Sequence, residues 1–502
     1  MVSRQKSEPP PSDLELLRTI LAPGGLSLKL FSRQGDGFAS VTMGSGREAF
    51  AIGSRGFRAW LRKEFLYDHK RYPSPYALRT AINEIADQAA DAREERIWRR
   101  VGTSDDVWFI DLGNENRCVV EIIPGSWNVI NTAPIHFVRS RSIRPFPATR
   151  TDGCINGDTG ELKDEDRSAH RQTFKEFAAL LNLDTPADFQ LLMTWCVCAL
   201  TPSGPYPVLT ICGEQGSAKS TLVRLIHDLV DPSLAPLRSL PSSEKDLFVS
   251  ASNAHLLAFD NVSNISPATS DNLCKISTGG VAALRRVGTD ADEVFLEFKA
   301  PIILNGIGDL ILRPDLADRA LFINTTAIPA EARRDSQLIQ AAFDELAPRL
   351  MEALLDLLAL ARYKLMTESA GLWKADNLPR MAEFAKLGMA IEGVFGEPGS
   401  FKGAYDRNRA AAADDLAEQD PILMTILEIW DEKQSWRGTM QDLQVEIARR
   451  LKASGSRLRA PTGLAQLSSH VKRITPILTK KGMMVAFHRA ASKDRRRTLE
   501  LF

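Results

Sequence analysis

A glycine-rich segment near the middle of the chain has the residue types that bind phosphate. Its sequence is Gly213-Glu214-Gln215-Gly216-Ser217-Ala218-Lys219-Ser220-Thr221. An apolar run ends at Cys212 and an amphipathic stretch begins at Leu222, which gives the strand, loop and helix order of a phosphate-binding loop. Backbone N–H groups and the positive end of the helix dipole would surround an anion there. The segment therefore predicts ATP and Mg²⁺ as cofactors, with Lys219 as a catalytic residue at the phosphates and the Ser220 hydroxyl on the metal.

Ala218 stands immediately before the lysine, where the usual pattern has glycine. A methyl group in place of hydrogen is the smallest possible change, and it is harmless where φ is negative. The alternative interpretation of the segment is a chance Gly/Ser-rich turn after a strand. Because a lysine, two hydroxyl residues and an amphipathic helix follow in the required order, we expect Ala218 to be a tolerated variant within a coherent site.

Two later apolar strands are each expected to end in a polar side chain. Residues 255–259 run into Asp260, and residues 300–304 run into Asn305. In phosphate-loop enzymes a strand-terminal Asp holds Mg²⁺ through water, so Asp260 is a candidate metal-binding and catalytic residue. The alternative is an Asp that only caps the next turn. The amide of Asn305 could reach the γ-phosphate or the attacking water, which makes Asn305 a further catalytic candidate.

Two arginines follow, within Arg313-Pro314-Asp315-Leu316-Ala317-Asp318-Arg319. Either guanidinium could stabilise the charge that develops in the transition state of phosphoryl transfer. In ring ATPases such an arginine is supplied across a subunit boundary. The alternative for either residue is an ordinary surface ion pair with Asp315 or Asp318.

Taken in order, these segments resemble the motifs of superfamily 3 helicases, and the chain looks like the AAA+-type ATPase of phage, plasmid and large-DNA-virus primase-helicases. The resemblance covers roughly residues 200–330 and rests on 213–221, 259–261, 304–306 and 313–319. It implies a homo-hexameric ring that hydrolyses ATP and translocates on single-stranded or forked DNA. It also implies individual roles: Lys219 and Ser220 as the Walker A residues, Asp260 as the Walker B acid, Asn305 as the sensor, and Arg313 or Arg319 as the finger.

Two features depart from the pattern of these relatives. Many of them carry two acids at the end of the second strand, whereas Asp260 is followed here by Asn261, whose amide cannot take a proton. Either Asp271 or Glu214 is the general base, or Asn261 only orients the water, or hydrolysis is slow. The acidic motif of a primase or polymerase domain is not recognisable, so a primase partner would be a separate chain.

Two basic regions are candidate DNA contacts, and they have different expected structures. Arg285 and Arg286 lie in the glycine-flanked segment 279–288, which resembles the hairpin that grips the DNA backbone in superfamily 3 rings. The segment 437–502 carries 15 Lys and Arg against 4 Asp and Glu, and its helical pattern followed by a basic hairpin looks like a winged helix. The alternatives are a solvated hairpin and a protein-docking winged helix. The C-terminal candidates are Lys472, Arg473, Arg495, Arg496 and Arg497.

The composition limits the class of protein. With 502 residues, of which 44% are hydrophobic, the chain provides for about three domains. Its 63 basic and 63 acidic residues give no net charge, so only local charge can argue for a polyanionic partner. Six scattered cysteines without metal-ligand spacing fit reduced thiols in a cytoplasmic protein. No apolar run approaches the ~18–20 residues that cross a membrane, so we expect no membrane partner.

The expected fold class is α/β, with a P-loop AAA+-like parallel sheet as its core. The N-terminal part contains no recognisable motif, and its basic cluster Arg139, Arg141 and Arg144 is expected at a solvated strand edge, with DNA contact as the alternative. The expected organisation is disorder over 1–12, an α+β domain over 13–150, a linker over 150–166, the ATPase core over 167–335, a helical lid over 336–400, a flexible connection over 399–414 and a winged-helix-like basic domain over 416–502.

The sequence supports two functions of different classes. The first is an ATP-dependent DNA translocase or helicase of mobile-element or phage replication. The second is a nucleotide-gated DNA-binding initiator or a defence-related ATPase without unwinding activity, which Asn261 favours. A metabolic P-loop kinase is disfavoured by Asn305, the arginine pair and the basic C-terminal segment.

Overall fold

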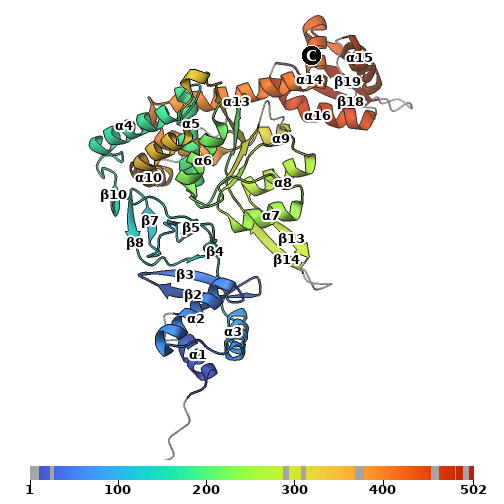
Figure 1. Cartoon of the computed structure of the whole chain (residues 1–502). Coiled ribbons are helices and arrows are strands. Elements are labelled where there is room, and N and C mark those ends of the chain that lie inside the picture. Colours follow the sequence, from blue (N-terminus) through green and yellow to red (C-terminus); the bar gives the residue numbers. More distant parts are fainter. Residues whose placement is uncertain are drawn as a thin grey trace, which may run out of the picture.

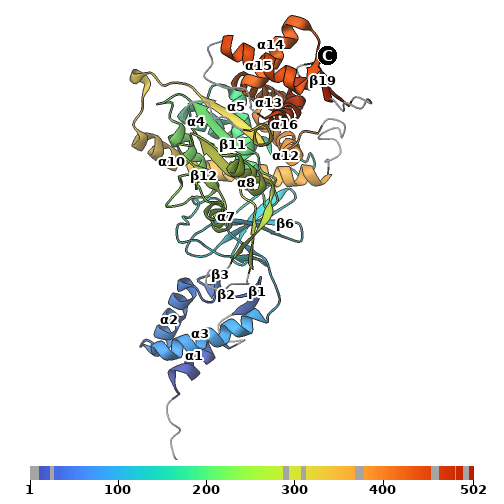
Figure 2. The same cartoon turned by 90° about the vertical axis from the view of Figure 1, so that its right-hand side faces the viewer.

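The computed structural model describes residues 11–22, 28–285, 293–306, 313–367, 378–453, 463–480, 482–489 and 497–501. A small N-terminal module lies at one end of an elongated molecule, a large body lies in the middle, and a C-terminal module lies at the other end (Figure 1 and Figure 2). The expected mixed α/β class, with a parallel sheet and many helices, is confirmed. Disorder is expected over residues 1–12. Residues 1–10 lie outside the described residues, and Ser12 caps the first helix.

The N-terminal module combines three helices with a three-stranded antiparallel sheet. A hairpin turns around residues 34–37 and places Phe31 opposite Phe38. Phe57 and Trp60 of the second helix lie in the core of the module. The elements are α1 (Asp13–Leu21), β1 (Lys29–Arg33), β2 (Asp36–Met43), β3 (Gly46–Ala51), α2 (Arg55–His69) and α3 (Pro75–Ala90).

A five-stranded antiparallel sheet follows, with the strand order β10-β8-β7-β6-β5. Its three central strands run antiparallel to one another over residues 107–130. The linker expected over 150–166 is wrong, because part of it forms β10 and pairs with β8 at the sheet edge. The strands are β5 (Val101–Ser104), β6 (Val107–Asp111), β7 (Val119–Ile123), β8 (Ser126–Ile130) and β10 (Asp152–Cys154), with β4 (Ile97–Trp98) and β9 (His136–Phe137) paired beside them.

A buried carboxylate explains why this polar stretch is ordered. Asp356 accepts hydrogen bonds from Trp127 Nε1 at 2.7 Å and His170 Nε2 at 2.8 Å, and it pairs with Arg150. Burial alone would raise the pKa of Asp356, but these two hydrogen bonds and the Arg150 charge lower it below its usual value. Through this contact the second sheet shares one continuous hydrophobic core with the body, without a break near residue 150.

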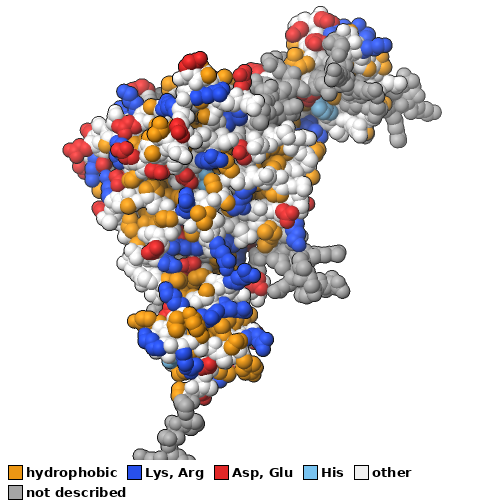
Figure 3. Space-filling model, viewed as in Figure 1, with side chains coloured by type: hydrophobic (Ala, Val, Ile, Leu, Met, Phe, Trp, Pro, Cys, Tyr) orange, Lys and Arg blue, Asp and Glu red, His pale blue; other side chains and the backbone are white. Residues whose placement is uncertain are grey.

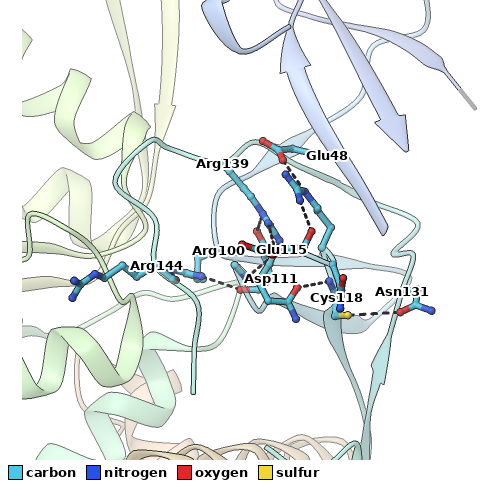
Figure 4. Close-up of polar contacts among 12 residues, drawn as sticks. Glu48, Arg100, Asp111, Glu115, Cys118, Asn131, Arg139 and Arg144 are labelled. Carbon is cyan, nitrogen blue, oxygen red and sulfur yellow. Dashed lines mark hydrogen bonds and ion pairs between the residues drawn. The ribbon is translucent and has the colours of Figure 1, made fainter. Parts of the chain in front are cut away.

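A buried ion pair lies where the N-terminal module meets the second sheet (Figure 4). Arg139 Nε lies 2.9 Å from a carboxylate oxygen of Asp111, which is 1% exposed, and Glu48 of β3 lies beside the pair. Burial raises the pKa of Glu48, and the Arg139 charge opposes that effect. The solvated strand edge expected for Arg139 is therefore wrong, since a buried acid far along the sequence holds it. Arg141 and Arg144 are exposed.

The body contains a four-stranded parallel sheet with the order β12-β15-β11-β16. An isolated parallel bridge between Arg238 and Phe259 extends it beyond β12. Because all four strands run in one direction, their carboxyl ends meet at one edge, where open α/β sheets bind ligands. The elements are α4 (Asp164–Leu180), α5 (Pro186–Ala199), β11 (Val208–Gly213), α6 (Lys219–Val230), α7 (Glu244–Asn253), β12 (Leu257–Phe259), α8 (Pro267–Thr278), β15 (Ile302–Asn305), α9 (Pro314–Ala317) and β16 (Ala320–Thr325).

An antiparallel hairpin of β13 (Gly280–Arg285) and β14 (Glu293–Phe298) projects from the body (Figure 1). Its base is fixed by Phe298, which stacks on Phe248 of α7 with the ring centroids 4.5 Å apart. Its outer strand contacts the N-terminal module through an ion pair of 2.5 Å between Glu297 and Arg33 of β1. The hairpin therefore lies between the two units and touches both.

Among the residues that the structure describes, the central sheet is followed by the helices η1 (Ala330–Ala332), α10 (Ser336–Thr367), α12 (Ala382–Phe395) and α13 (Ser400–Gln419). The flexible connection expected over 399–414 is wrong, because α13 spans nearly all of it. Four consecutive alanines at 410–413 favour helix, but the polar residues around them concealed the pattern. The side chain of Asn408 hydrogen-bonds both the N–H and the C=O of Phe322, at 3.2 and 2.5 Å, along the outer edge of β16.

The C-terminal module has three helices and a three-stranded sheet with the order β17-β19-β18. The three helices and the two last strands are confirmed. The first strand was not expected, because its four residues include a glycine and carry little pattern, yet it pairs with β19. The elements are α14 (Pro421–Lys433), β17 (Trp436–Thr439), α15 (Met440–Ala453), α16 (Leu464–Lys480), β18 (Val485–Arg489) and β19 (Arg497–Leu501).

The cysteines and the apolarity of the helices concern the whole described chain. All six cysteines are free thiols. Among the helices in the described ranges, none is long and apolar enough to cross a membrane.

One buried guanidinium ties the second sheet to the helix that follows the glycine-rich loop. Arg100 is 1% exposed, and its Nε donates to Asp231, the residue that ends α6, at 2.9 Å. Its other nitrogens donate to the carbonyls of Asp111, Arg144 and Pro232 at 3.0–3.1 Å. Although burial alone would raise the pKa of Asp231, the Arg100 charge lowers it. The pair is therefore buried in its charged form, and each nitrogen of the guanidinium has a hydrogen-bond acceptor.

His227 of α6 lies in the same region and should make folding sensitive to pH. It is 3% exposed, and burial lowers its pKa from 6.5 to about 4. Between pH 6.5 and about 4 the imidazole is protonated in the unfolded chain but neutral in the folded chain. The free energy of unfolding therefore falls as the pH falls. Lowering the pH from 7 to 5 should reduce the free energy of unfolding of the wild type by about 2 kcal/mol more than that of His227→Gln, as measured by urea unfolding.

The matched control is the same substitution at His488, whose side chain is 48% exposed on β18. His488→Gln shows the effect of removing an exposed imidazole, and the difference between the two variants is the effect of burying His227. An unchanged pH dependence in His227→Gln would mean that His227 is not held neutral by the fold.

Candidate nucleotide-binding site

Three polar side chains meet at the carboxyl edge of the parallel sheet. Ser220 Oγ lies 3.1 and 3.3 Å from the two carboxylate oxygens of Asp260. Asn305 Nδ2 lies 3.2 Å from Ser220 Oγ and also donates to Asp260. Asn305 is 2% exposed, and its Oδ1 is buried without a hydrogen-bond partner among the described residues. The strand ends thus bring together a hydroxyl, a carboxylate and an amide that has an unused acceptor.

Lys219 is folded back onto the loop that precedes it. Its Nζ donates to the carbonyls of Gly213 at 2.8 Å and Glu214 at 2.6 Å, and lies 3.3 Å from Ser217 Oγ. The residue is 7% exposed, and burial lowers the pKa of its ammonium. A phosphate oxygen would be a stronger acceptor for this charge than the neutral carbonyls are. The ammonium therefore lies where an anion in the loop would reach it.

Ala218 has a left-handed backbone, with φ of 62° and ψ of 23°. The loop therefore does not adopt the negative φ at which a methyl group is harmless. The left-handed conformation costs roughly 1–2 kcal/mol for an L-residue. Gly213 has φ of 147° and cannot be replaced by a larger residue without a clash, since a Cβ there would lie 2.4 Å from Thr325 Oγ1. The loop is strained at one position and requires glycine at another.

Two residues that sequence reasoning missed brace this loop from outside. Thr325 ends β16, and its Oγ1 lies 2.8 Å from Ser217 Oγ. Asn182, in the turn between α4 and α5, donates to the Ser217 carbonyl at 3.1 Å. Thr325 could have been found by the same rule as the other site residues, because it is a polar residue at the end of a parallel strand. Asn182 belongs to no pattern in the sequence.

Arg333, just after η1, is a third residue without a motif. It is exposed, and its guanidinium lies beside the loop, since a Cβ on Gly216 would be 3.4 Å from Arg333 Nη2. The guanidinium of Arg333 therefore lies beside Gly216 of the loop, within the same chain.

Asn261 occupies the position where relatives carry a second acid, and its backbone is unusual. It is exposed with φ of 55°, a left-handed conformation that asparagine tolerates better than most residues. Its N–H donates to Asp260 Oδ1 at 3.1 Å, and a hollow of about 620 Å³ borders both residues. Of the other candidate bases, Glu214 is exposed in the loop, and Asp271 is paired with Arg313 at 2.9 Å.

Arg319 lies away from the loop of its own chain. The carbonyl of Arg319 accepts from Val208 N at 2.9 Å, where β11 begins, whereas the loop follows the end of β11. From Val208 to Gly213 the strand advances roughly 16 Å at its usual rise per residue. Arg319 Nη1 donates to the Asp315 carbonyl at 2.7 Å, and Arg313 Nε lies 3.6 Å from the Asp315 carboxylate.

The DNA-binding candidates fall on two separate units. Arg285 is the last residue of β13 in the projecting hairpin, and Arg497 is the first residue of β19. Lys472 and Arg473 are exposed on α16, and Lys472 Nζ lies 5.5 Å from the ring centroid of Phe487. The other candidates, Arg286, Arg495 and Arg496, lie outside the described residues.

Comparison with known protein families identifies the class of this chain. Residues 175–419 match the actinomycete integrative conjugative element replication protein, and residues 422–502 match the AICE RepA C-terminal domain. The chain belongs to the replication protein family of actinomycete integrative conjugative elements. The first match contains the whole candidate site, and the two matches meet where α13 ends and α14 begins. The family name indicates a role in the replication of a mobile element.

Among solved structures, the chain is similar to the apo structure of the NrS-1 C terminal region (305-718), with 12% identity and a TM-score of 0.39. That match covers 97% of this chain and 99% of the other. The A form apo structure of the same region gives the same values, and a further A form apo structure gives 11% identity over 98% of this chain and 99% of the other, with a TM-score of 0.39. No curated protein matches the chain.

The left-handed backbone at Ala218 predicts that glycine is better there. Ala218→Gly should raise the free energy of unfolding by up to about 1 kcal/mol, because the relief of strain exceeds the added entropy of the unfolded chain. Ala341 is exposed inside α10, and Ala341→Gly should lower it by about 0.5–1 kcal/mol. Urea unfolding of both variants tests the opposite signs, and destabilisation by both would contradict the strained loop.

Proposed function

We propose that this protein is an ATP-dependent DNA translocase with helicase activity that acts in replication of the mobile element. The observation that carries the proposal is the convergence of Lys219, Ser220, Asp260 and Asn305 at one edge of a parallel sheet. Phosphoryl transfer needs this combination: a backbone loop and a cation for the phosphates, ligands for Mg²⁺, and a polar group near the attacking water. The sheet would then be a P-loop AAA+-like core, with α10 and α12 as its helical lid.

The residues present fit ATP together with Mg²⁺. Mg²⁺ usually takes one or two carboxylates and fills its other positions with phosphate oxygens and water, so Ser220 and Asp260 would suffice on the protein side. The unpartnered Oδ1 of Asn305 would orient a water. Bound Mg²⁺ would neutralise charge on the β- and γ-phosphates.

The position of Arg319 favours a site that is completed between subunits. It lies at the edge of the sheet opposite the loop of its own chain, so its guanidinium would serve only the nucleotide of a neighbouring copy. An arginine supplied in this way stabilises the charge of the transition state and contributes roughly 10³–10⁵ to kcat in other phosphoryl-transfer enzymes. A homo-hexameric ring would provide that neighbour for every site.

Two basic units would contact the DNA that such a ring encloses. The projecting hairpin of β13 and β14 carries Arg285 and would grip the phosphate backbone. The C-terminal module has the helix and strand order of a winged helix, with Lys472 and Arg473 exposed on its third helix. Contacts with phosphates there would make DNA binding weaken steeply with salt.

A second function is favoured by one observation, the amide at position 261. Without a carboxylate after Asp260, the attacking water would lack its usual base, and turnover would be slow. A nucleotide-gated initiator that binds DNA without unwinding it, or a defence-related ATPase, would suit such a site. Tight, ATP-dependent DNA binding with no strand separation on forked DNA would favour this function over a motor.

Lys219→Ala should abolish ATP hydrolysis, because no other cation on this helix reaches the phosphates from within the loop. Phosphate release with and without single-stranded DNA measures the effect. Lys245→Ala, on the exposed face of α7, is the matched control and should retain wild-type turnover. Hydrolysis that survives Lys219→Ala would refute the site assignment.

Arg319→Ala should inactivate the enzyme in a way that a second defective subunit can repair. In a mixture with Lys219→Ala subunits, roughly a quarter of randomly assembled sites would combine an intact lysine with an intact neighbouring arginine. ATP hydrolysis should therefore reappear on mixing two inactive variants. If the mixture stays inactive, Arg319 acts only within its own chain.

A further inference from the structure

One face of the N-terminal module is strongly basic, and neither the sequence motifs nor the candidate site explains it. The face is formed by residues 55–79, which include α2, the turn after it and the start of α3. Two acids, Glu64 and Asp68, lie in this span, and all of its arginines and lysines are exposed. Basic and hydrophobic side chains cover this end of the molecule (Figure 3). The basic residues are Arg55, Arg58, Arg62, Lys63, Lys70, Arg71 and Arg79.

Three tyrosines are exposed among these cations. The exposed fractions are 71% for Tyr67, 58% for Tyr72 and 68% for Tyr76. Arg62 Cζ lies 4.9 Å from the ring centroid of Tyr72, and Lys70 Nζ lies 4.9 Å from that of Tyr67. Each of these two rings is therefore paired with a cation and still open to solvent, an arrangement we call the basic aromatic face.

The turn between α2 and α3, which carries Tyr72 and separates Tyr67 from Tyr76, is fixed by hydrogen bonds. Lys70 ends α2 with φ of 54° and donates its N–H to Leu66 O at 2.9 Å. Ser74 caps α3 by accepting from Ala77 N at 3.3 Å, and its N–H donates to Asp13 of α1 at 2.7 Å. A ligand that binds here would meet rings on a backbone that is already ordered, so little conformational entropy is lost.

We propose that the basic aromatic face binds single-stranded nucleic acid, with the tyrosines stacking on bases and the cations contacting phosphates. Exposed aromatic rings among basic side chains are the features that sequence-tolerant single-strand binding uses. A duplex keeps its bases stacked on one another, so it would offer these rings no free base. A membrane surface would need the apolar side of α2, but Phe57, Trp60 and Phe65 are buried in the core of the module.

The position of this face gives the binding a use in the proposed function. The N-terminal module touches the projecting hairpin through Arg33 and Glu297, and it lies at the end of the molecule opposite the C-terminal module (Figure 1). A single strand that leaves the body at the hairpin would reach this module. Binding at the face itself requires neither nucleotide nor Lys219, so its failure is distinguishable from failure of the proposed function.

The first test locates the contact by cross-linking. Full-length protein carrying Lys219→Ala, without nucleotide, is irradiated with a thymidine oligonucleotide that contains 5-iododeoxyuridine, and the adducts are mapped by mass spectrometry. Adducts on Tyr67, Tyr72 or Tyr76 are expected. Adducts confined to the hairpin or the C-terminal module would overturn the proposal.

The second test measures affinity with a matched pair of triple variants. Replacing the three tyrosines by alanine should weaken binding of a labelled oligothymidine at least about tenfold, because stacking on each ring is lost. Replacing them by phenylalanine keeps the rings and should leave the affinity within about twofold of wild type.

Three comparisons make this second test decisive. Duplex DNA of the same length should bind both triple variants equally. Equal oligothymidine affinity of the alanine variant and the wild type would overturn the proposal. Loss of binding to phosphatidylserine vesicles, with oligothymidine binding unchanged, would also overturn it and would assign the face to a membrane.

Discussion

The buried pairing of Arg100 with Asp231 is the interaction on which the geometry of the candidate site depends. Asp231 ends the helix that begins at Lys219, and its second carboxylate oxygen accepts from Leu256 N at 3.2 Å, just before β12. One carboxylate therefore fixes the far end of α6 and the start of the strand that leads to Asp260. Because a buried ion pair is stable only when its hydrogen bonds are satisfied, Arg100 needs the carbonyl of Asp111 in the second sheet and those of Arg144 and Pro232 outside it. The second sheet is thus part of the support of the site.

Much of the site could be predicted from the sequence, for a reason of geometry. Parallel strands end at a common edge, so an apolar run that ends in Asp260 or Asn305 can be placed next to a loop at the end of another strand without knowledge of the whole fold. The helices and strands with clear periodicity were predictable for a similar reason, since 3.6- and two-residue repeats are local. The glycine-rich loop needed only its own residues and their immediate neighbours.

Several of the features that escaped prediction depend on partners far along the chain. Arg139 carries no mark of its buried acid, Asp111, and the polar stretch at 152–154 is a strand only because β8 lies beside it. Asn182 reaches Ser217 across 35 residues, which no local pattern encodes. The backbone angle of Ala218 is of the same kind: the residue type suggested a negative φ, and the loop imposes a positive one. Tertiary context overrode local preference at each of these positions.

The long helix α13 leads to the C-terminal module, and one of its side chains, Asn408, is hydrogen-bonded to the last strand of the parallel sheet. Asn408 takes the place of a fifth strand at the edge of β16, because it pairs with both the N–H and the C=O of Phe322. Three residues further along the same strand, Thr325 contacts the glycine-rich loop. The same edge strand thus contacts both this helix and the glycine-rich loop. A small rotation of β16 at the loop would therefore reach the helix that leads to the C-terminal module.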